Sequence, residues 1–381
     1  MNAQTIERAA ARVPPTGSAE RREHSLLSFG EEFLLESGVS LPRIDIAYET
    51  FGTLNDEGTN AILVCHALTG NAHAGRKDAA GAGAGWWDGI IGKGKGLDTD
   101  RYFVICSNIL GSCYGTTGPT SLDPGTGRQY RTTFPQVTVR DMVRVQKRLL
   151  DTIGVRRIET VIGGSLGGMQ VLEWGILYPD FVRTIIPVAT SAMHSAWCIG
   201  ISEAQRLAIM GDPAWEGGNY TKQPAQGLAL ARMIAMISYR SRLSFEGKFG
   251  RTTVTGANQE RFPSVFDQLP YSFQIESYLR YQGQKLVDRF DANTYLLLTR
   301  AMDLHDVSAG RGSVNDALGE IKAKALCVGI SSDVLYPVVE QQQIAGALPH
   351  GRYAEIESIH GHDAFLIEFE VLNCLIRQFL G

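Results

Sequence analysis

The sequence predicts an α/β protein with an open, mostly parallel, doubly wound sheet and an inserted helical lid. Short apolar runs of the kind buried in parallel sheets recur along the chain. Helical stretches separate several of these runs, and the strand signal disappears between about residues 191 and 310. We therefore expect a poorly ordered arm over residues 1–25, a core formed by residues 26–190 and 311–381, and a helical lid over residues 191–310.

The composition is that of a globular protein with small-molecule partners. Of the 381 residues, 44% are hydrophobic, which is enough for a sizeable core, and the formal net charge is -4. No block of one charge sign points to nucleic acid or to a membrane surface. The polar start of the chain lacks the apolar segment of a signal peptide, so a cytoplasmic location is expected.

The strands are predicted from two kinds of pattern. Segment 32–51 alternates apolar and polar residues, as half-buried antiparallel edge strands do. Fully apolar runs predict buried parallel strands, and a final strand precedes the closing segment of the chain. These strands are expected at residues 62–65, 103–106, 160–162, 184–189, 325–330 and 353–356.

Three helices are clear from periodicity. Residues 139–153 carry an apolar stripe at helical spacing, and Thr138 with Asp141 resembles a capping box. Residues 227–240 are apolar nearly all round, which predicts burial between layers or in a subunit contact. A closing helix is expected to start around Asp363.

The sequence Gly163-Gly164-Ser165-Leu166-Gly167 follows a predicted strand and precedes a helical segment. The pattern G-x-S-x-G at such a turn is typical of a nucleophile elbow, in which small residues leave room for a sharp bend. The simpler interpretation is an ordinary glycine-rich turn. In the elbow interpretation, Ser165 is the nucleophile, at the positive end of the following helix.

A serine nucleophile needs a base and a group that orients the base. In α/β-hydrolases these groups occur in the order Ser, acid, His. Asp333 follows the predicted strand 325–330 and is the candidate acid, whereas either His360 or His362, after the last strand, could be the base. The oxyanion hole is expected to combine the Leu166 amide with the Leu68 amide of the loop His66-Ala67-Leu68-Thr69-Gly70, with His66 itself structural.

Two other motifs do not support a cofactor site. Residues 89–96 reproduce G-x-x-x-x-G-K, but Gly96 replaces the hydroxyl residue that would bind magnesium, and no strand precedes the motif. His360, His362 and Asp363 lie close together but lack the spacing of a metal-ligand set. We expect neither a bound metal nor a nucleotide site.

Taken together, the motifs resemble one family, the homoserine O-acyltransferases of the α/β-hydrolase fold and chiefly the homoserine O-acetyltransferases. The similarity runs through nearly the whole chain after the N-terminal arm. It is carried by YETFG, HALTG, GSCYGTTGP, FPQVTVRDMV, GGSLGGMQ, SSDVLYP and GHDAF, at residues 48–52, 66–70, 111–119, 134–143, 163–170, 331–337 and 361–365.

This resemblance implies specific roles and substrates. It implies Ser165 as nucleophile, Asp333 as acid and His362, rather than His360, as base. It also implies transfer of an acetyl group from acetyl-CoA, a cosubstrate, to the hydroxyl of L-homoserine, before sulfur enters methionine biosynthesis. No permanently bound cofactor is implied, and the expected assembly is a homodimer whose lid helices pair.

A free amino acid as acceptor needs a cation for its carboxylate and an anion for its ammonium group. Arg232 and Tyr239 are seven residues apart on a predicted helix, hence on one face, and both match substrate-binding positions of the family. Asp363 matches the carboxylate that binds the amine. The alternative for Arg232 is a lid ion pair unrelated to substrate.

Departures from the family pattern leave the substrates open. The family often has an acidic residue where this chain has Asn71, and bulky aromatic residues where it has Val334 and Tyr336. A succinyl donor or a serine acceptor therefore remains an alternative. A plain esterase is a rival function, because it would use the same triad. A non-catalytic binding module is a second rival, but it would have no reason to keep Ser165, Asp333 and His362 in this order.

Overall fold

The computed structural model describes residues 25–76, 83–254 and 273–381. The arm predicted over residues 1–25 lies outside the described residues, apart from Ser25. Ser25 is the first residue of strand β1 (Ser25–Phe29). No helix in the described ranges is long and apolar enough to cross a bilayer.

Eight strands form the central sheet, in the order β1-β4-β6-β5-β7-β8-β9-β10. All pairs from β6 to β10 are parallel, and β4 is antiparallel to both β1 and β6. The predicted mostly parallel sheet is confirmed. The bounds of the strands after β1 are β4 Ile44–Phe51, β5 Ala61–Cys65, β6 Phe103–Ser107, β7 Ile158–Gly164, β8 Val182–Val188, β9 Lys324–Ile330 and β10 Gly351–Ile356.

The prediction that segment 32–51 supplies edge strands is wrong for its longest element. Strand β4 lies between β1 and β6, because residues 25–29 pair along it and take the edge position. Strands β2 (Phe33–Leu34) and β3 (Ser40–Leu41) form a separate two-stranded sheet. The alternating pattern identified a half-buried strand correctly, but it carries no information about which neighbours pair with it.

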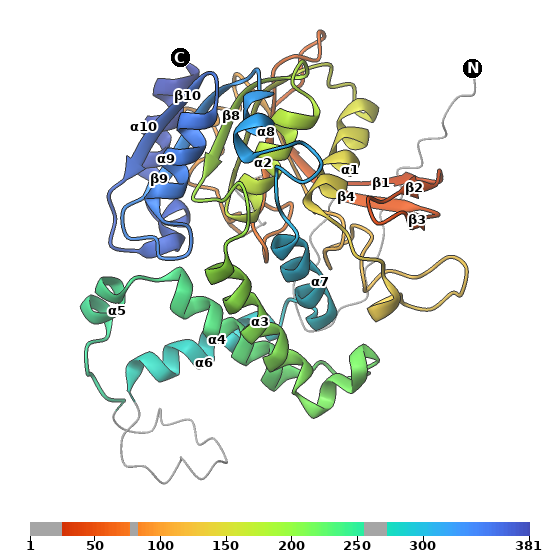
Figure 1. The fold of residues 1–381 in the computed structure, drawn as a ribbon, viewed down its shortest axis with the longest axis vertical. Helices are drawn as coiled ribbons and strands as arrows, with labels where there is room; N and C mark the ends of the chain where they lie inside the picture. Colours follow the sequence, from red (N-terminus) through yellow and green to blue (C-terminus); the bar gives the residue numbers. More distant parts are fainter. Residues whose placement is uncertain (1–24, 77–82, 255–272) are drawn as a thin grey trace.

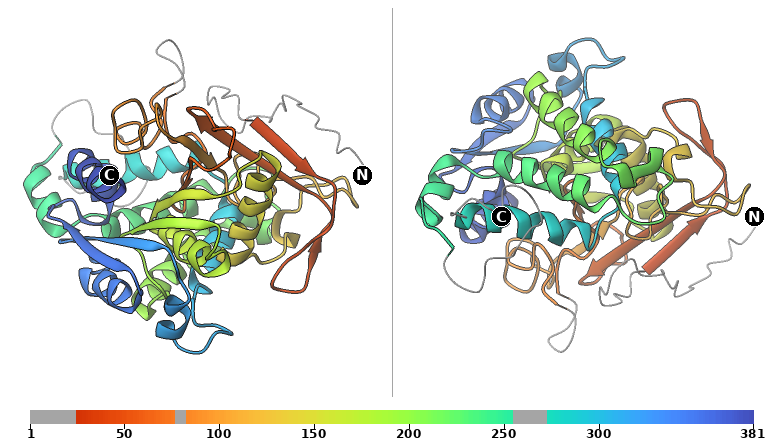
Figure 2. Two further views of the ribbon diagram at one scale, coloured as in Figure 1. Left: turned by 90° about the horizontal axis from the view of Figure 1, so that it is seen from above. Right: turned by 90° about the horizontal axis from the view of Figure 1, so that it is seen from below.

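Helices cover both faces of the sheet, as a doubly wound fold requires. One core cluster joins the sheet to α1 (Val139–Thr152), α2 (Leu166–Leu177), α8 (Val314–Gly319) and α9 (Val338–Ala347). The second cluster packs α10 (Phe369–Leu380) and the loop around Trp87 on the opposite face (Figure 2). The capping box of Thr138 and Asp141 at the start of α1 is present.

The closing helix starts later than predicted. Residues Gly361–Leu366 form a 3₁₀ turn, η4, and α10 begins at Phe369. Gly361 has a φ of 68°. Since this left-handed conformation is incompatible with a regular helix, the region around Asp363 is a tight turn that presents individual side chains.

Between β8 and α8 the described residues form helices and no strand longer than an isolated bridge. These helices gather at one end of the sheet, away from the C-terminus (Figure 1). Helix α4 contacts both α3 and α6. The bounds are α3 Ala196–Met210, η2 Pro213–Gly218, α4 Ala225–Tyr239, α5 Arg242–Lys248, α6 Gln274–Val287 and α7 Ala292–Asp303.

Helix α4 is the segment that the sequence describes as apolar nearly all round. Leu228, Ala231 and Ala235 are buried within the chain, but Ile237 is 57% exposed. Of the two interpretations offered by the sequence, burial between layers therefore accounts for one face only. The other face remains open to solvent in the single chain.

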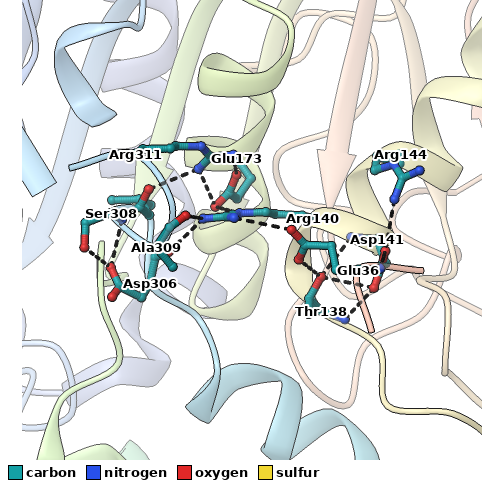
Figure 3. A network of polar contacts seen from close by, with 11 residues as sticks. Glu36, Thr138, Arg140, Asp141, Arg144, Glu173, Asp306, Ser308, Ala309 and Arg311 are labelled. Atoms are coloured by element: carbon teal, nitrogen blue, oxygen red, sulfur yellow. Dashed lines mark hydrogen bonds and ion pairs between the residues drawn. The ribbon is translucent and has the colours of Figure 1, made fainter. Parts of the chain in front are cut away.

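A network of ion pairs holds the segment that returns from these helices to the core (Figure 3). Glu173 of α2 is buried and accepts hydrogen bonds from Arg140 at 3.0 Å and from both terminal nitrogens of Arg311, at 3.0 and 2.8 Å. Arg140 also donates to the carbonyl groups of Asp306 and Ala309. The segment 306–311 is thereby fixed to α1 and α2, and α2 directly follows Ser165.

Candidate active site

Ser165 occupies the sharp turn between the end of β7 and the start of α2. Its φ of 58° and ψ of -126° are values that a non-glycine residue rarely adopts. The strained turn is held because the Ser165 amide donates to the carbonyl groups of Val188 and Ala189, at 3.0 and 3.2 Å, and its own carbonyl accepts from the Thr190 hydroxyl at 2.8 Å. The side chain is thus presented at the carboxyl end of the sheet, as an elbow requires.

The glycines beside Ser165 are required by close packing. A Cβ atom at Gly164 would lie 2.7 Å from the ring of Phe365, and a Cβ atom at Gly167 would collide with the carbonyl oxygen of Cys65. The second contact brings the start of α2 directly against the end of β5, where the loop 66–70 begins. The two glycines of the pattern G-x-S-x-G, Gly163 and Gly167, both pack against the carbonyl oxygen of Cys65, and the additional Gly164 packs against Phe365, so both sides of the elbow are close-packed.

Asp333 and His362 form a buried pair. Asp333 follows β9, and its Oδ1 accepts hydrogen bonds from the amides of Leu335 and Tyr336, at 2.8 and 3.0 Å. Its Oδ2 lies 2.7 Å from Nδ1 of His362. Because a carboxylate only accepts, Nδ1 carries a proton, and in the neutral form of this ring the lone pair is on Nε2, which is the tautomer that a general base needs.

His360 lies outside this arrangement. Its Nδ1 is 3.2 Å from a guanidinium nitrogen of Arg240, and its Nε2 is 3.9 Å from Glu368. Of the two histidines left open by the residue pattern, only His362 contacts Asp333. The described residues contain no group of three or more His, Cys, Asp or Glu side chains placed to hold a metal ion.

Three aromatic rings surround the imidazole of His362. The ring centroids of Tyr239, Tyr336 and Phe365 lie 5.6, 5.2 and 5.5 Å from that of His362. Phe365 also covers the elbow at Gly164, so one ring touches both His362 and the turn that carries Ser165. Among the described residues no hydrogen bond links the Ser165 hydroxyl to His362. Such bonds are often long in ligand-free enzymes.

The two predicted oxyanion elements are joined by a buried glutamine. Gln170, on α2, donates through Nε2 to the carbonyl oxygens of His66 and Leu166, each at 3.2 Å. Gln146 donates to Gln170 at 2.8 Å and in turn accepts from the Trp174 indole at 2.8 Å. This chain of amides fixes the loop that carries Leu68 relative to the turn that carries Leu166.

His66 stabilises the same loop from inside the core, as the sequence predicts. It is fully buried; its Nδ1 lies 2.8 Å from the carbonyl of Ala67, and its Nε2 accepts from the amide of Ile109 at 3.2 Å. These two bonds require a neutral ring with the proton on Nδ1. Burial lowers the pKa of His66 to about 4, which keeps the ring neutral.

Of the three predicted acceptor-binding residues, Tyr239 packs on His362, Arg232 contacts Tyr239, and Asp363 directly follows His362 in the chain. The guanidinium of Arg232 is 5.4 Å from the centre of the Tyr239 ring, which itself packs on His362. Asp363 is 3.8 Å from Arg240. Burial raises the pKa of Asp363, and the positive charges of Arg232 and Arg240 oppose that rise.

Comparisons with known proteins agree with this geometry. The α/β hydrolase fold family matches residues 60–369. Homoserine O-acetyltransferase of Moorella thermoacetica is 54% identical over 353 residues, which cover 91% of this chain and 92% of that protein. The chain belongs to the homoserine O-acetyltransferase family. It is therefore an enzyme, and its sheet is that of an α/β hydrolase.

Among solved structures, this homoserine O-acetyltransferase family member is similar both to a transferase and to an esterase. The crystal structure of homoserine O-acetyltransferase from Bacillus anthracis has a TM-score of 0.85 and 31% identity, and covers 95% of this chain and 98% of that one. The crystal structure of esterase E22 has a TM-score of 0.84 and 31% identity, and covers 94% of this chain and 100% of that one. The fold is therefore shared by two reaction types.

Several residues of the site in this homoserine O-acetyltransferase family member were missed by sequence reasoning. No motif distinguishes Arg240, although it directly follows Tyr239, and Gln170 is only the last residue of the motif GGSLGGMQ. In the sequence Tyr336 differs from the family pattern and carries no other signal. Its hydroxyl lies 3.1 Å from Nε2 of the buried His194, whose Nδ1 is 3.2 Å from Asp303 at the end of α7. An Asp-His-hydroxyl series thus connects the end of α7 with a ring that packs on His362.

Proposed function

We propose that this enzyme transfers an acetyl group from acetyl-CoA to the hydroxyl of L-homoserine through an acylated Ser165. The observation that carries the proposal is the 2.7 Å contact between Oδ2 of Asp333 and Nδ1 of His362, together with the ring of Phe365, which packs both on His362 and on the elbow of Ser165. Membership of the homoserine O-acetyltransferase family supports the choice of donor and acceptor. The product would be an activated homoserine, as in the step before sulfur enters methionine.

The proposed reaction has two halves. In the first, Nε2 of His362 takes the proton of the Ser165 hydroxyl as Oγ attacks the thioester carbon, and the same proton leaves with the coenzyme A thiolate. In the second, His362 takes the proton of the homoserine hydroxyl as its oxygen attacks the acyl carbon, and it gives that proton to Ser165 Oγ as the bond between Oγ and the acyl carbon breaks. Asp333 orients the imidazole and stabilises its charged form, while the Leu68 and Leu166 amides bind the oxyanion in both halves.

The proposed acceptor site explains why a free amino acid is bound. Arg232 would pair with the carboxylate of homoserine and Asp363 with its ammonium group, because each charge loses hydration in a partly buried pocket. Tyr239, which touches both Arg232 and His362, would place the substrate against the base. The contact between Arg240 and Asp363 keeps that carboxylate in place before the substrate arrives.

A hydrolase is the second candidate function, because esterase E22 has nearly the same fold. Both would acylate Ser165, so the acceptor decides between them. Coenzyme A release should be measured from acetyl-CoA and succinyl-CoA, each with homoserine, serine and water. Acetyl-CoA with homoserine should be the fastest combination; equal rates with water would favour a hydrolase, and a larger kcat/KM with succinyl-CoA would change the donor.

Mutations separate the two halves of the reaction. Ser165→Ala should abolish both turnover and the acyl adduct seen by intact mass after acetyl-CoA alone. Arg232→Ala should leave acylation intact and slow transfer to homoserine steeply, because only the second half meets the amino acid. Loss of acylation in Arg232→Ala, with normal deacylation, would instead assign Arg232 to the coenzyme A path. His362→Ala should be inactive, whereas His360→Ala should keep most of its activity.

We further propose that residues 191–310 act as the lid and that two lids pair in a homodimer. Large apolar side chains are exposed on its helices, namely Trp197, Leu207, Leu230, Ile237 and Leu243. Exposed apolar surface of this kind is typical of a protein interface. Sedimentation should give the mass of a dimer, and Ile237→Asp should give a monomer.

A further inference from the structure

Arg289 lies in the short connection between α6 and α7, and it reaches across to the loop 66–70. Its Nη1 donates to the carbonyl oxygen of Thr69 at 2.7 Å and to the hydroxyl of Tyr114 at 2.8 Å. Its Nη2 is 3.3 Å from the hydroxyl of Thr69. One guanidinium group from the lid segment thus makes two hydrogen bonds to Thr69, in the loop that follows β5, and a third to Tyr114, which lies after β6.

The loop at this point is a tight turn. The amide of Gly70 donates to the carbonyl of Ala67 at 2.9 Å, so Leu68 and Thr69 are the two central residues. Holding the Thr69 carbonyl fixes the rotation of the peptide after Thr69, and the turn transmits this restraint to the preceding peptides. The Leu68 amide, the proposed oxyanion donor, belongs to this same turn.

The loop is held from two directions. On the core side, His66 bonds to Ile109, and Gln170 bonds to the carbonyl of His66. On the lid side, Arg289 holds Thr69. Core contacts fix the start of the loop, but the central residues of the turn are fixed by a residue more than 200 positions later in the chain.

The charge of Arg289 adds to this restraint. Each hydrogen-bond partner that the structure gives it is neutral: a carbonyl oxygen and two hydroxyls. A guanidinium whose hydrogen-bond partners are uncharged places a positive charge beside the turn. A negative charge that develops at the oxyanion is stabilised by such a preorganised cation.

We propose that Arg289 is a positioning residue that holds the oxyanion turn from the lid side, so that the oxyanion hole is complete only when the lid segment is seated. The inference rests on the proposed acyl transfer. It assigns to Arg289 a role unlike that of Arg232, since both halves of the reaction use the oxyanion hole and only one uses the acceptor site. Loss of Arg289 should therefore slow acylation and deacylation by the same factor.

The test compares Arg289→Met and Arg289→Lys with the wild-type enzyme. Single-turnover coenzyme A release measures acylation, and decay of the isolated acyl-enzyme with homoserine measures deacylation. In Arg289→Met both rates should fall roughly 30- to 100-fold, because a displaced donor costs somewhat less than the 10²- to 10³-fold loss of a deleted one. The KM for homoserine should change little.

A transition-state mimic distinguishes positioning from general damage. A small alkylboronic acid adds to the active serine and places one oxygen in the oxyanion hole, so its affinity for Arg289→Met should fall by about the same factor as the rates. Binding of coenzyme A should not change. Lysine keeps the charge but can serve fewer acceptors at once, so Arg289→Lys should recover part of both rates. The same substitution at the exposed Arg183, Arg183→Met, is the matched control and should behave as wild type.

The outcomes separate this inference from the proposed function. Wild-type rates and boronate affinity in folded Arg289→Met would overturn the role of Arg289, and so would a loss confined to deacylation. If Arg289→Met does not fold, Arg289→Lys still decides, since it should show the same parallel loss, of roughly tenfold. Full activity in Ser165→Ala would instead overturn the acyl-enzyme, whatever the Arg289 variants do.

Discussion

The burial of a neutral His66 predicts that this protein loses stability in mild acid. Burial lowers the pKa of His66 to about 4, whereas an unfolded histidine has a pKa of about 6.5. The folded pKa is the lower one, so the unfolded state binds the extra proton. Stability is therefore unaffected above about pH 6.5 and falls as the pH drops from there towards about pH 4.

The size of the effect follows from these two values. At pH 5 the unfolded histidine is almost fully protonated and the folded one is mostly neutral, so His66 alone costs about 2 kcal/mol of unfolding free energy relative to pH 7.5. The physical reason is visible in its contacts. A proton on Nε2 would remove the acceptor of the Ile109 amide and bury a charge among apolar strands.

The variant His66→Gln isolates this contribution. A glutamine oxygen can still accept from Ile109 but does not titrate, although the bond of Nδ1 to Ala67 is lost, at a cost of about 1 kcal/mol at neutral pH. Urea unfolding of both proteins at pH 7.5 and pH 5 gives the two differences in free energy. The drop between these pH values should be smaller by about 2 kcal/mol in the variant. Equal drops in both proteins would show that His66 is not held neutral, and would refute the reasoning.

Three further changes test other buried polar groups. Burial raises the pKa of Glu340 to about 6, above its unfolded value, so its ionisation lowers the free energy of unfolding as the pH rises from about 4.5 to 6. Glu340→Gln should therefore stabilise the fold by about 1 kcal/mol at pH 7.5 and by nothing at pH 4. An equal gain at both pH values would contradict this. Glu173→Gln should lower the free energy of unfolding in urea by about 2 to 3 kcal/mol, because Arg311 loses its bidentate partner. A decrease below about 0.5 kcal/mol would show that the network in Figure 3 contributes little to stability. Tyr336→Phe should lower the free energy of unfolding by about 1 to 3 kcal/mol, since His194 loses its hydroxyl partner. It should leave kcat within about fivefold of wild type, because the ring stays against His362. A roughly hundredfold fall in kcat without loss of stability would give the hydroxyl a chemical role.

Much of the fold could be predicted because its signals are local. The apolar runs 62–65, 103–106 and 325–330 fall within β5, β6 and β9, and the capping box at Thr138 marks the start of α1. Burial on both faces of a parallel sheet demands continuous apolar runs, so the sequence alone reveals such strands. The elbow is equally local, because its glycines and Ser165 are adjacent in the chain.

The neighbours of each strand and the contacts of each site residue depended on the tertiary structure. The sequence left His360 and His362 as equal candidates from residue pattern alone, and only the fold shows which ring contacts Asp333. It placed β4 at an edge, because a strand's own residues do not state which strand lies beside it. The sequence motifs alone showed that a serine, an acid and a histidine occur along the chain in the order found in α/β-hydrolases. The contacts of Arg289, Arg240 and Gln170 were decided only by folding, because each hydrogen bond or ion pair joins groups whose separation along the chain has no regular spacing to detect.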